Sequence, residues 1–305
     1  MKAAFLYEWR RATTLRSTWW IAGSAVVASL FFTWVAFKIE TSVVGGSDGP
    51  PAVAGKTSFA VIINSMQGPY QIVTTVIAAF AAMSWGHEYR YGLTRVTFSA
   101  FPRRAEVFIA KTGVVVLVTT LIWLMATGAS IAFLKAIDTT GKVNFDFFWQ
   151  FESGVGANSG LGAQSSVIAF TSYAYEALLR SLAYLLLLVL LVAAISALTR
   201  SLPLALVLAS VWPLFVEKLL LMLSQVVSKG RLGWLNDVAP FDNAERFVAW
   251  RASYDPAARP SDVAGGYAPP GIEHIITPWR AGMVFALWAV LLTAAAYLSV
   301  ERRDA

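Results

Sequence analysis

The chain has 305 residues, of which 57% are hydrophobic and only 14% are charged. Soluble domains carry about a quarter charged residues, so this composition excludes a disordered chain and argues against a soluble enzyme. The absence of cysteine excludes disulfides, thiolate metal sites and cysteine nucleophiles, and two histidines leave little for a histidine-based metal site. We therefore expect a membrane protein.

Six long stretches with almost no charge predict membrane-spanning helices, because a hydrocarbon core of about 30 Å needs about 20 helical residues. The predicted spans are residues 18–37, 59–86, 112–134, 181–199, 203–226 and 281–300. The fifth span is the least regular, since it contains Pro213 and two adjacent charges. The expected fold is an all-α polytopic membrane protein that forms a single transmembrane domain over residues 1–305.

The distribution of basic residues predicts the orientation of these spans. If both termini lie on one side, that side has 48 residues outside the spans with 12 Lys and Arg, whereas 129 residues on the other side have the remaining 12. The density is nearly threefold higher on the first side, so we expect both termini to be cytoplasmic in a plasma or inner membrane. The first apolar run is long enough to span, and we interpret it as an uncleaved helix rather than a signal peptide.

The segment before the first span, residues 1–17, is predicted to be an amphipathic helix. Phe5, Trp9 and Ala12 recur at helical spacing while most charged residues fall elsewhere, which is typical of a helix lying in the cytoplasmic interface. Such a helix is either a basic anchor that sets topology or a contact platform for a cytoplasmic partner, and the pattern favours neither.

The long outer segment, residues 229–278, contains one signal for a helix. Asp242 followed three residues later by Glu245 has the spacing of a capping box and predicts a short helix on the outer leaflet. Glu176 and Arg180, four residues apart where the fourth span begins, are expected to form an ordinary surface pair.

Charges inside an apolar span are expensive and usually functional. Glu217 and Lys218 are adjacent, so their side chains project about 100° apart on a helix and cannot pair easily. One interpretation, which we favour, is that the helix ends near Val216 and the pair lies at the outer interface. The other is that the pair lines a translocation path beside a kink at Pro213.

Polar groups within spans are candidates for lining a substrate path, because polar side chains that face lipid would lack partners. The candidate path residues are Asn64, Gln67, Tyr70, Gln71, Trp212 and Glu217. His87 and His274 fall on opposite sides of the membrane, so we expect no shared metal site.

The loop between the second and third spans carries the most informative pattern. Glu88, Gly92 and Arg95 lie at i, i+4 and i+7, which predicts a short helix before Pro102. A second helix beginning near Pro102 would run straight into the third span, because proline suits a first helical turn. Such a charged elbow could transmit movement from a cytoplasmic domain into two membrane helices, or it could be a basic loop that only sets topology.

The elbow resembles the type-2 ATP-binding-cassette (ABC) exporter permease family in three features: a Glu-x-Arg-x-Gly segment, a Pro-x-Arg turn, and a lysine that opens the third span. The matching positions are Glu88, Arg90, Gly92, Pro102, Arg104 and Lys111. The six-span layout, the N-terminal helix and the long outer loop agree as well, so the resemblance covers nearly the whole chain. One departure is Leu93-Thr94, where the family more often has Thr and then Leu.

The resemblance implies a non-catalytic permease subunit that exports an amphiphilic or lipophilic substrate, such as a drug, an antibiotic or a lipid-like compound. Two copies of a separate cytoplasmic ATPase subunit, which hold ATP and Mg, would join a dimer of this chain or a heterodimer with a homologous permease. No cofactor is expected in this chain, and the other expected partners are membrane lipids, not nucleic acid. The implied contacts with the ATPase are His87, Glu88, Arg90, Gly92, Arg95 and Arg104.

Residues 49–57 partly match the sequence pattern of a phosphate-binding loop. The segment Gly-Pro-Pro-Ala-Val-Ala-Gly-Lys-Thr has five residues between its glycines where the motif needs four, and it falls on the outer side. ATP hydrolysis is therefore expected from another polypeptide.

Two other classes remain as alternatives. A secondary transporter would need buried ionisable residues in several spans to bind coupling ions, and five of the six predicted spans have none. A polytopic membrane enzyme would need acids, bases or metal ligands that converge at one face, whereas the candidates Asp237, Asp242, Glu245 and His274 have no spacing that indicates a site.

Overall fold

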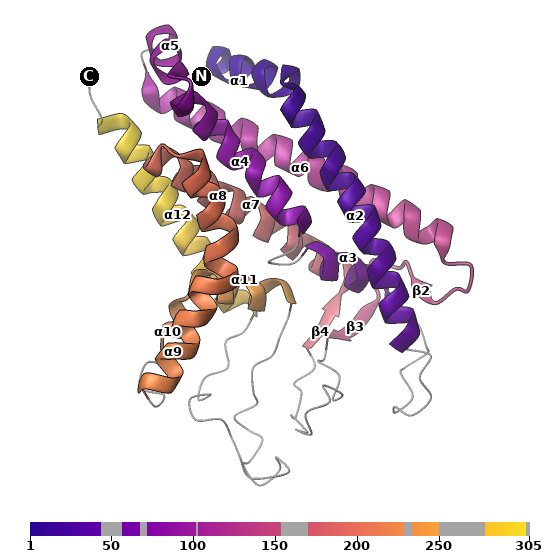
Figure 1. Ribbon diagram of the computed structural model, residues 1–305. Coiled ribbons are helices and arrows are strands. Elements are labelled where there is room, and N and C mark those ends of the chain that lie inside the picture. Colours follow the sequence, from indigo (N-terminus) through magenta and orange to yellow (C-terminus); the bar gives the residue numbers. More distant parts are fainter. Residues whose placement is uncertain are drawn as a thin grey trace.

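The protein is described here from a computed structural model, which covers residues 1–43, 57–67, 72–101, 103–153, 170–228, 234–249 and 278–302. Long helices run side by side along most of the molecule (Figure 1). The start of α1, the short helix α5 and the end of α12 lie at one end of this bundle, and α11 and the strands lie at the other. The described part is mainly helical, which confirms the all-α prediction.

The helices are α1 (Lys2–Thr14), α2 (Arg16–Val43), α3 (Phe59–Gln67), α4 (Ile72–Arg90), α5 (Leu93–Ala100), α6 (Arg104–Ile137), α7 (Ala174–Thr199), α8 (Leu202–Val211), α9 (Lys218–Ser228), α10 (Trp234–Val238), α11 (Pro240–Ala249) and α12 (Pro278–Arg302). A π-helical segment, η2 (Trp212–Glu217), joins α8 to α9. Two small sheets accompany them. The strand β1 (Thr57–Ser58) pairs in parallel with β2 (Val143–Asn144), and β3 (Gln150–Ser153) pairs antiparallel with β4 (Phe170–Tyr173).

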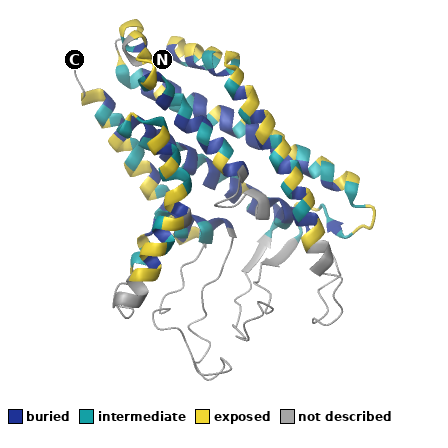
Figure 2. Ribbon diagram, viewed as in Figure 1, coloured by how far each residue is buried: buried dark blue, intermediate teal, exposed yellow. Residues whose placement is uncertain are grey.

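Four helices in the described residues are long and apolar enough to cross a membrane, and a bent fifth span is possible. The four are the Arg16–Ile39 part of α2, α6, α7 and the Trp279–Arg302 part of α12. They coincide with the first, third, fourth and sixth predicted spans, and they identify a membrane protein. Their outer faces expose large apolar side chains, whereas the faces that meet inside the bundle are buried (Figure 2).

The second predicted span, residues 59–86, is not one continuous helix in the described residues. It is divided between α3 and α4, and residues 68–71 between them lie outside the described part. Neither α3 nor α4 is by itself both long and apolar enough to span a membrane. The prediction joined them because it counted the absence of charge, which says nothing about helix continuity.

The fifth predicted span, residues 203–226, is bent. The axes of the segments Leu202–Val211 and Phe215–Leu223 differ by 52°. The π-helical segment carries Pro213 at its start, and proline removes one backbone donor from the helical ladder. The bend therefore lies where the second interpretation placed a kink, at Pro213. The π-helical segment ends at Glu217 and α9 begins at Lys218, so the two charges lie at the boundary between these helical segments.

The centre of the bundle is an apolar core in which α7 packs against α4 and α12, and α2 packs against α6. Gly86 on α4 permits a close approach of α8, since a Cβ placed at Gly86 would lie 2.6 Å from Cβ of Leu202. Within the α2–α6 interface, three fully buried hydroxyls meet. Ser29 and Ser130 lie 2.8 Å apart, and Thr33 donates to Ser130 at 3.1 Å.

Candidate functional site: the charged elbow

The elbow consists of the end of α4, the short helix α5 and the start of α6. α4 ends at Arg90, and Gly92 then adopts a left-handed conformation with φ of 66°, which a residue without a Cβ accepts at little cost. The expected short helix before Pro102 is present as α5, but it does not include Glu88, because Gly92 separates α4 from α5. The expected second helix is present, since α6 begins at Arg104 and continues into the bundle.

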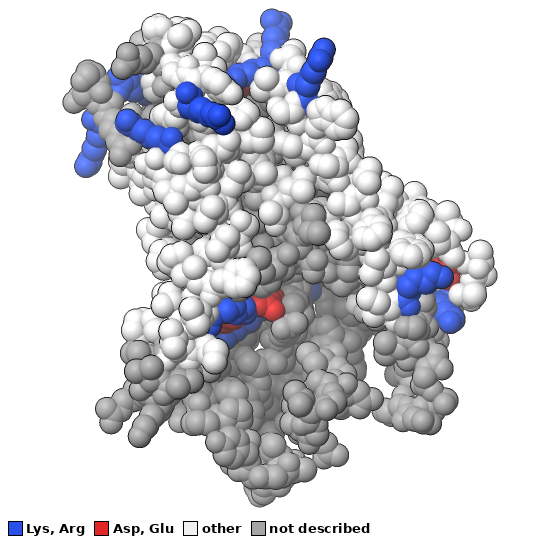
Figure 3. Space-filling model, viewed as in Figure 1, with Lys and Arg blue, Asp and Glu red and all other residues white. Residues whose placement is uncertain are grey.

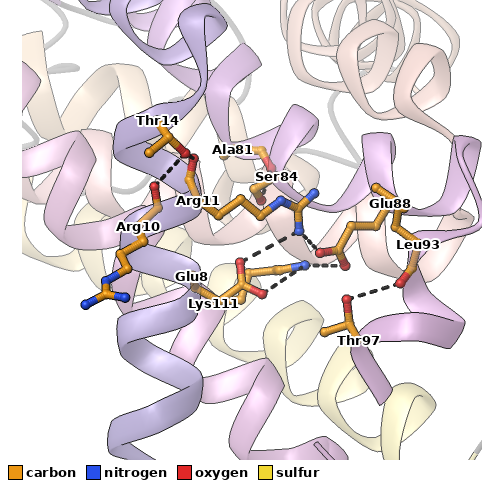
Figure 4. A network of polar contacts seen from close by, with 10 residues as sticks. All are labelled: Glu8, Arg10, Arg11, Thr14, Ala81, Ser84, Glu88, Leu93, Thr97 and Lys111. Carbon is orange, nitrogen blue, oxygen red and sulfur yellow. Dashed lines mark hydrogen bonds and ion pairs between the residues drawn. The ribbon is translucent and has the colours of Figure 1, made fainter. Parts of the chain in front are cut away.

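Four ionisable side chains from three helices meet beneath the elbow, and we call them the α1–α4–α6 cluster. Glu88 of α4 forms ion pairs with Arg11 of α1 and Lys111 of α6 (Figure 4). Glu8 of α1 lies 3.9 Å from Arg11 and 3.8 Å from Lys111. Glu88 and Lys111 are each only 1% exposed. Two carboxylates thus neutralise two cations, which is the condition for holding charge inside an apolar protein.

An aromatic ring contacts the cluster, and a second ring packs against the first. The Nζ atom of Lys111 lies 4.4 Å from the ring centre of Trp85, within the range of a cation–π contact. Tyr89 stacks on Trp85 at 6.2 Å, and Arg200 lies 5.7 Å from the ring centre of Tyr89. Arg200 follows α7 directly and has a left-handed conformation. Its contact with Tyr89 therefore connects the elbow to the turn between α7 and α8.

The N-terminal helix α1 differs from the prediction in the face that it buries. Ala4, Glu8 and Ala12 are buried against the bundle, whereas Phe5 and Trp9 are only partly buried. The prediction placed the charged residues away from the packed face. It missed that Glu8 shares a face with two alanines at four-residue spacing, and this pattern is the signal that could have revealed an inward-facing acid.

The predicted contacts with an ATPase divide into internal and surface positions. Glu88 is internal, so any coupling role of its carboxylate acts through the packing of α1, α4 and α6. Arg90 and Gly92 are exposed, and Arg104 is partly buried with its guanidinium 5.5 Å from the ring of Phe98. The side chain of Arg95 lies outside the described residues.

His87 lines a small cavity of about 50 Å³ together with Arg11, Ser84 and Lys111. Partial burial lowers the pKa of His87 below its ordinary value, and the positive charges of Arg11 and Arg90 lower it further. The imidazole is therefore held neutral near pH 7, and it packs edge-on against the ring of Tyr91.

The outward face of the elbow is apolar within a basic surrounding. Tyr91 and Val96 are 65% and 64% exposed, and Leu93 is exposed beside them. Lys and Arg side chains gather at this end of the molecule (Figure 3). An exposed apolar patch with a charged border is typical of a surface that contacts another protein.

The opposite end holds a second group of charges, which we call the α11 cluster. Lys218 donates to Asp242 at 3.0 Å and to Glu245 at 2.7 Å, and Arg246 pairs with Asp242 at 2.8 Å. Glu217 is buried, and its Oε1 atom accepts a hydrogen bond of 2.6 Å from the backbone N–H of Asp242. Glu217 therefore caps the N-terminus of α11, the role that the sequence had suggested for Asp242, which instead lies inside the first turn.

Arg180 of α7 occupies the other end of α11. It is 2% exposed, and its Nη1 atom donates to the carbonyl oxygen of Phe247 at 3.3 Å. Arg180 is therefore not at the surface as expected, although its Nε atom also donates to the backbone carbonyl oxygen of Glu176 at 3.3 Å. An acid at the N-terminus and a base at the C-terminus both complement the dipole of α11. The helix packs into the bundle against α12 and α7.

The candidate path residues do not assemble into one described site. Glu217 is buried against α11, whereas Trp212 is exposed on the surface of the bent span. The side chains of Asn64 and Gln67 on α3 lie outside the described residues, as do Tyr70, Gln71, His274 and the glycine-rich segment 49–56.

No protein-family model matches the chain, and no curated protein matches it either. The fold by itself defines a helical membrane protein. Buried ion pairs join the two helices of its elbow to α1.

Proposed function

We propose that the chain is the membrane-spanning subunit of an ATP-driven exporter and that its ATPase is a separate polypeptide. The observation that carries the proposal is the elbow: the short helix α5, with its exposed apolar face, lies between the end of α4 and the start of α6, and the buried α1–α4–α6 cluster joins these two helices to α1. A partner that pushes on α5 would move α1, α4 and α6 together, because separating Glu88 from Lys111, each 1% exposed, would leave buried polar groups without partners.

The proposed assembly contains two permeases, either identical or homologous, and two cytoplasmic ATPase subunits that bind ATP and Mg. In this assembly both termini and α5 face the cytoplasm, and the start of α1, the end of α12 and α5 lie together at one end of the bundle (Figure 1). The apolar, aromatic-rich interior suits an amphiphilic or lipophilic substrate.

The test is to purify the full chain from its native membrane in a mild detergent and to identify the proteins that accompany it. We expect an ATPase subunit with the native chain and its loss with Val96→Glu, which places a charge in the exposed apolar face of α5. The matched control is Phe148→Glu, since Phe148 is 75% exposed between β2 and β3 at the opposite end. An assembly without any ATPase, or equal loss in both variants, would contradict the proposal.

A further inference from the structure

An open apolar groove of about 520 Å³ lies between α1 and the first part of α6. Among its lining residues are Lys2, Phe5, Leu6, Ile109, Ala110 and Gly113. The volume falls within the range of about 300–1,000 Å³ that is typical of small-molecule sites. The ammonium group of Lys2 and the amino group of Met1 are charged groups of this lining, and Gly113 leaves the groove open because it has no side chain to fill it.

Beyond the groove, the surface of α6 remains apolar. Ile109, Leu117 and Leu121 are exposed, and with Gly113 they follow one another at four-residue intervals, so they share one face of the helix. The twelve helical steps from Ile109 to Leu121 cover about 18 Å. One leaflet of the hydrocarbon core is about 15 Å thick, so this face matches the length of one extended acyl chain.

The charges at the mouth of the groove favour an anion. Lys2 is exposed at its border. The neighbouring carboxylate of Glu106 already accepts from Arg103 at 3.1 Å and from the amino group of Met1 at 2.5 Å. The carboxylate is therefore neutralised, while the positive charge of Lys2 remains available near the level where lipid phosphates lie.

We propose that this groove binds a phospholipid with an anionic headgroup: one acyl chain lies against Phe5, Gly113 and Leu117, and the phosphate lies beside Lys2. The lipid comes from the leaflet at the end of the molecule that carries α1 and α5. The site does not depend on an ATPase partner, so it stands or falls independently of the exporter proposal.

The absence of cysteine allows a single reporter to be placed beside the groove. Leu117→Cys, labelled with a small fluorophore, is reconstituted into vesicles that contain brominated phosphatidylglycerol or brominated phosphatidylcholine. The control reporter is Leu287→Cys on α12, which is also exposed. Contact between Phe108 and Tyr297 at 5.7 Å aligns the two helices, and Leu117 and Leu287 lie nine and ten residues from these rings, at similar depth.

We expect the anionic lipid to quench the Leu117→Cys reporter at about fivefold lower concentration than the zwitterionic lipid, and no such preference at the control. Lys2→Gln should remove the preference, and Gly113→Leu should remove it by filling the groove. Equal preference at both reporters, or none at either, would overturn the proposal. Weak quenching by both lipids at the Leu117→Cys reporter alone would show that protein covers the groove, and it would overturn the proposal as well.

Discussion

The two ends of the molecule neutralise buried charge in different ways. In the α1–α4–α6 cluster, side chains from three helices compensate one another, and the central pair of Glu88 and Lys111 is almost wholly buried. In the α11 cluster, backbone groups share the task, because Glu217 accepts from a helix N-terminus and Arg180 donates near its C-terminus. In the first arrangement, the loss of any one of the four side chains leaves a buried charge without its partner. The second distributes the charge over many partners.

The largest expected effect is the removal of one charge from the α1–α4–α6 cluster. Glu88→Leu leaves Lys111 and Arg11 with Glu8 alone, and we expect the free energy of unfolding to fall by about 3–5 kcal/mol. The double variant Glu88→Leu/Lys111→Met should recover most of the loss, since the remaining Glu8 and Arg11 balance each other. The measurement is unfolding in mixed micelles with a rising fraction of denaturing detergent.

The control for this comparison is Arg103→Gln. Arg103 pairs with Glu106 on the surface, with its side chain 82% exposed, and such pairs contribute little to stability. A double variant as unstable as Glu88→Leu would show that the contacts of these side chains, rather than charge balance, hold the three helices together.

A second comparison uses the glycine at each end where two elements approach most closely. An alanine Cβ at Gly86 would lie 2.6 Å from Cβ and 2.9 Å from Cα of Leu202, so backbone must move. At Gly282 it would lie 2.6 Å from the ring of Phe247, which can tilt. We expect Gly86→Ala to cost about 2–3 kcal/mol and Gly282→Ala to cost less.

The matched control is Gly128→Ala on α6, where no atom lies within 4 Å of the added Cβ. Thermal unfolding of the three purified variants should leave this control unchanged or slightly stabilised, because alanine favours a helix more than glycine does. A lower unfolding temperature for Gly282→Ala than for Gly86→Ala would mean that the α11 end is the more rigid of the two.

A smaller effect is expected at the N-terminus of α11. Glu217→Leu removes the acceptor for the backbone N–H of Asp242 and should reduce stability by about 1–2 kcal/mol. Glu217→Gln keeps an acceptor oxygen and should retain most of this contribution. Hydrogen exchange of the α11 amides measures the effect locally, and equal protection in both variants would refute a capping role.

The smallest expected effect is a pH dependence at the elbow. The pKa of His87 in the folded protein lies below its value of 6.5 in the unfolded chain. The unfolded chain therefore binds more protons, so stability is retained above pH 6.5 and falls as the pH drops below that value. The slope of unfolding free energy between about pH 7 and pH 5 should be smaller in His87→Gln. An unchanged slope would assign the effect to other groups.

The fold could be predicted from the sequence where a single local property of the chain decides the structure. Length and lack of charge located α2, α6, α7 and α12, and the proline at position 213 located a bend. The sequence was insufficient where partners come from distant segments. Glu88 lies 77 residues from Arg11, and Glu217 lies 25 residues from Asp242, so no local spacing relates them. The charges of Arg180 and Glu8 were assigned to surfaces because charge usually lies there, and burial followed from neighbours that spacing does not reveal.

The three buried hydroxyls between α2 and α6 determine how α2 can move. Ser29 and Thr33 lie at the midpoint of α2, with about 20 Å of helix on either side. Sliding α2 along α6 by one turn would break both hydrogen bonds between the two helices. Tilting about them would preserve both hydrogen bonds. A tilt of α2 about these hydroxyls would therefore carry its two ends in opposite directions, so that a displacement where α2 joins α1 would be accompanied by an opposite displacement at its far end.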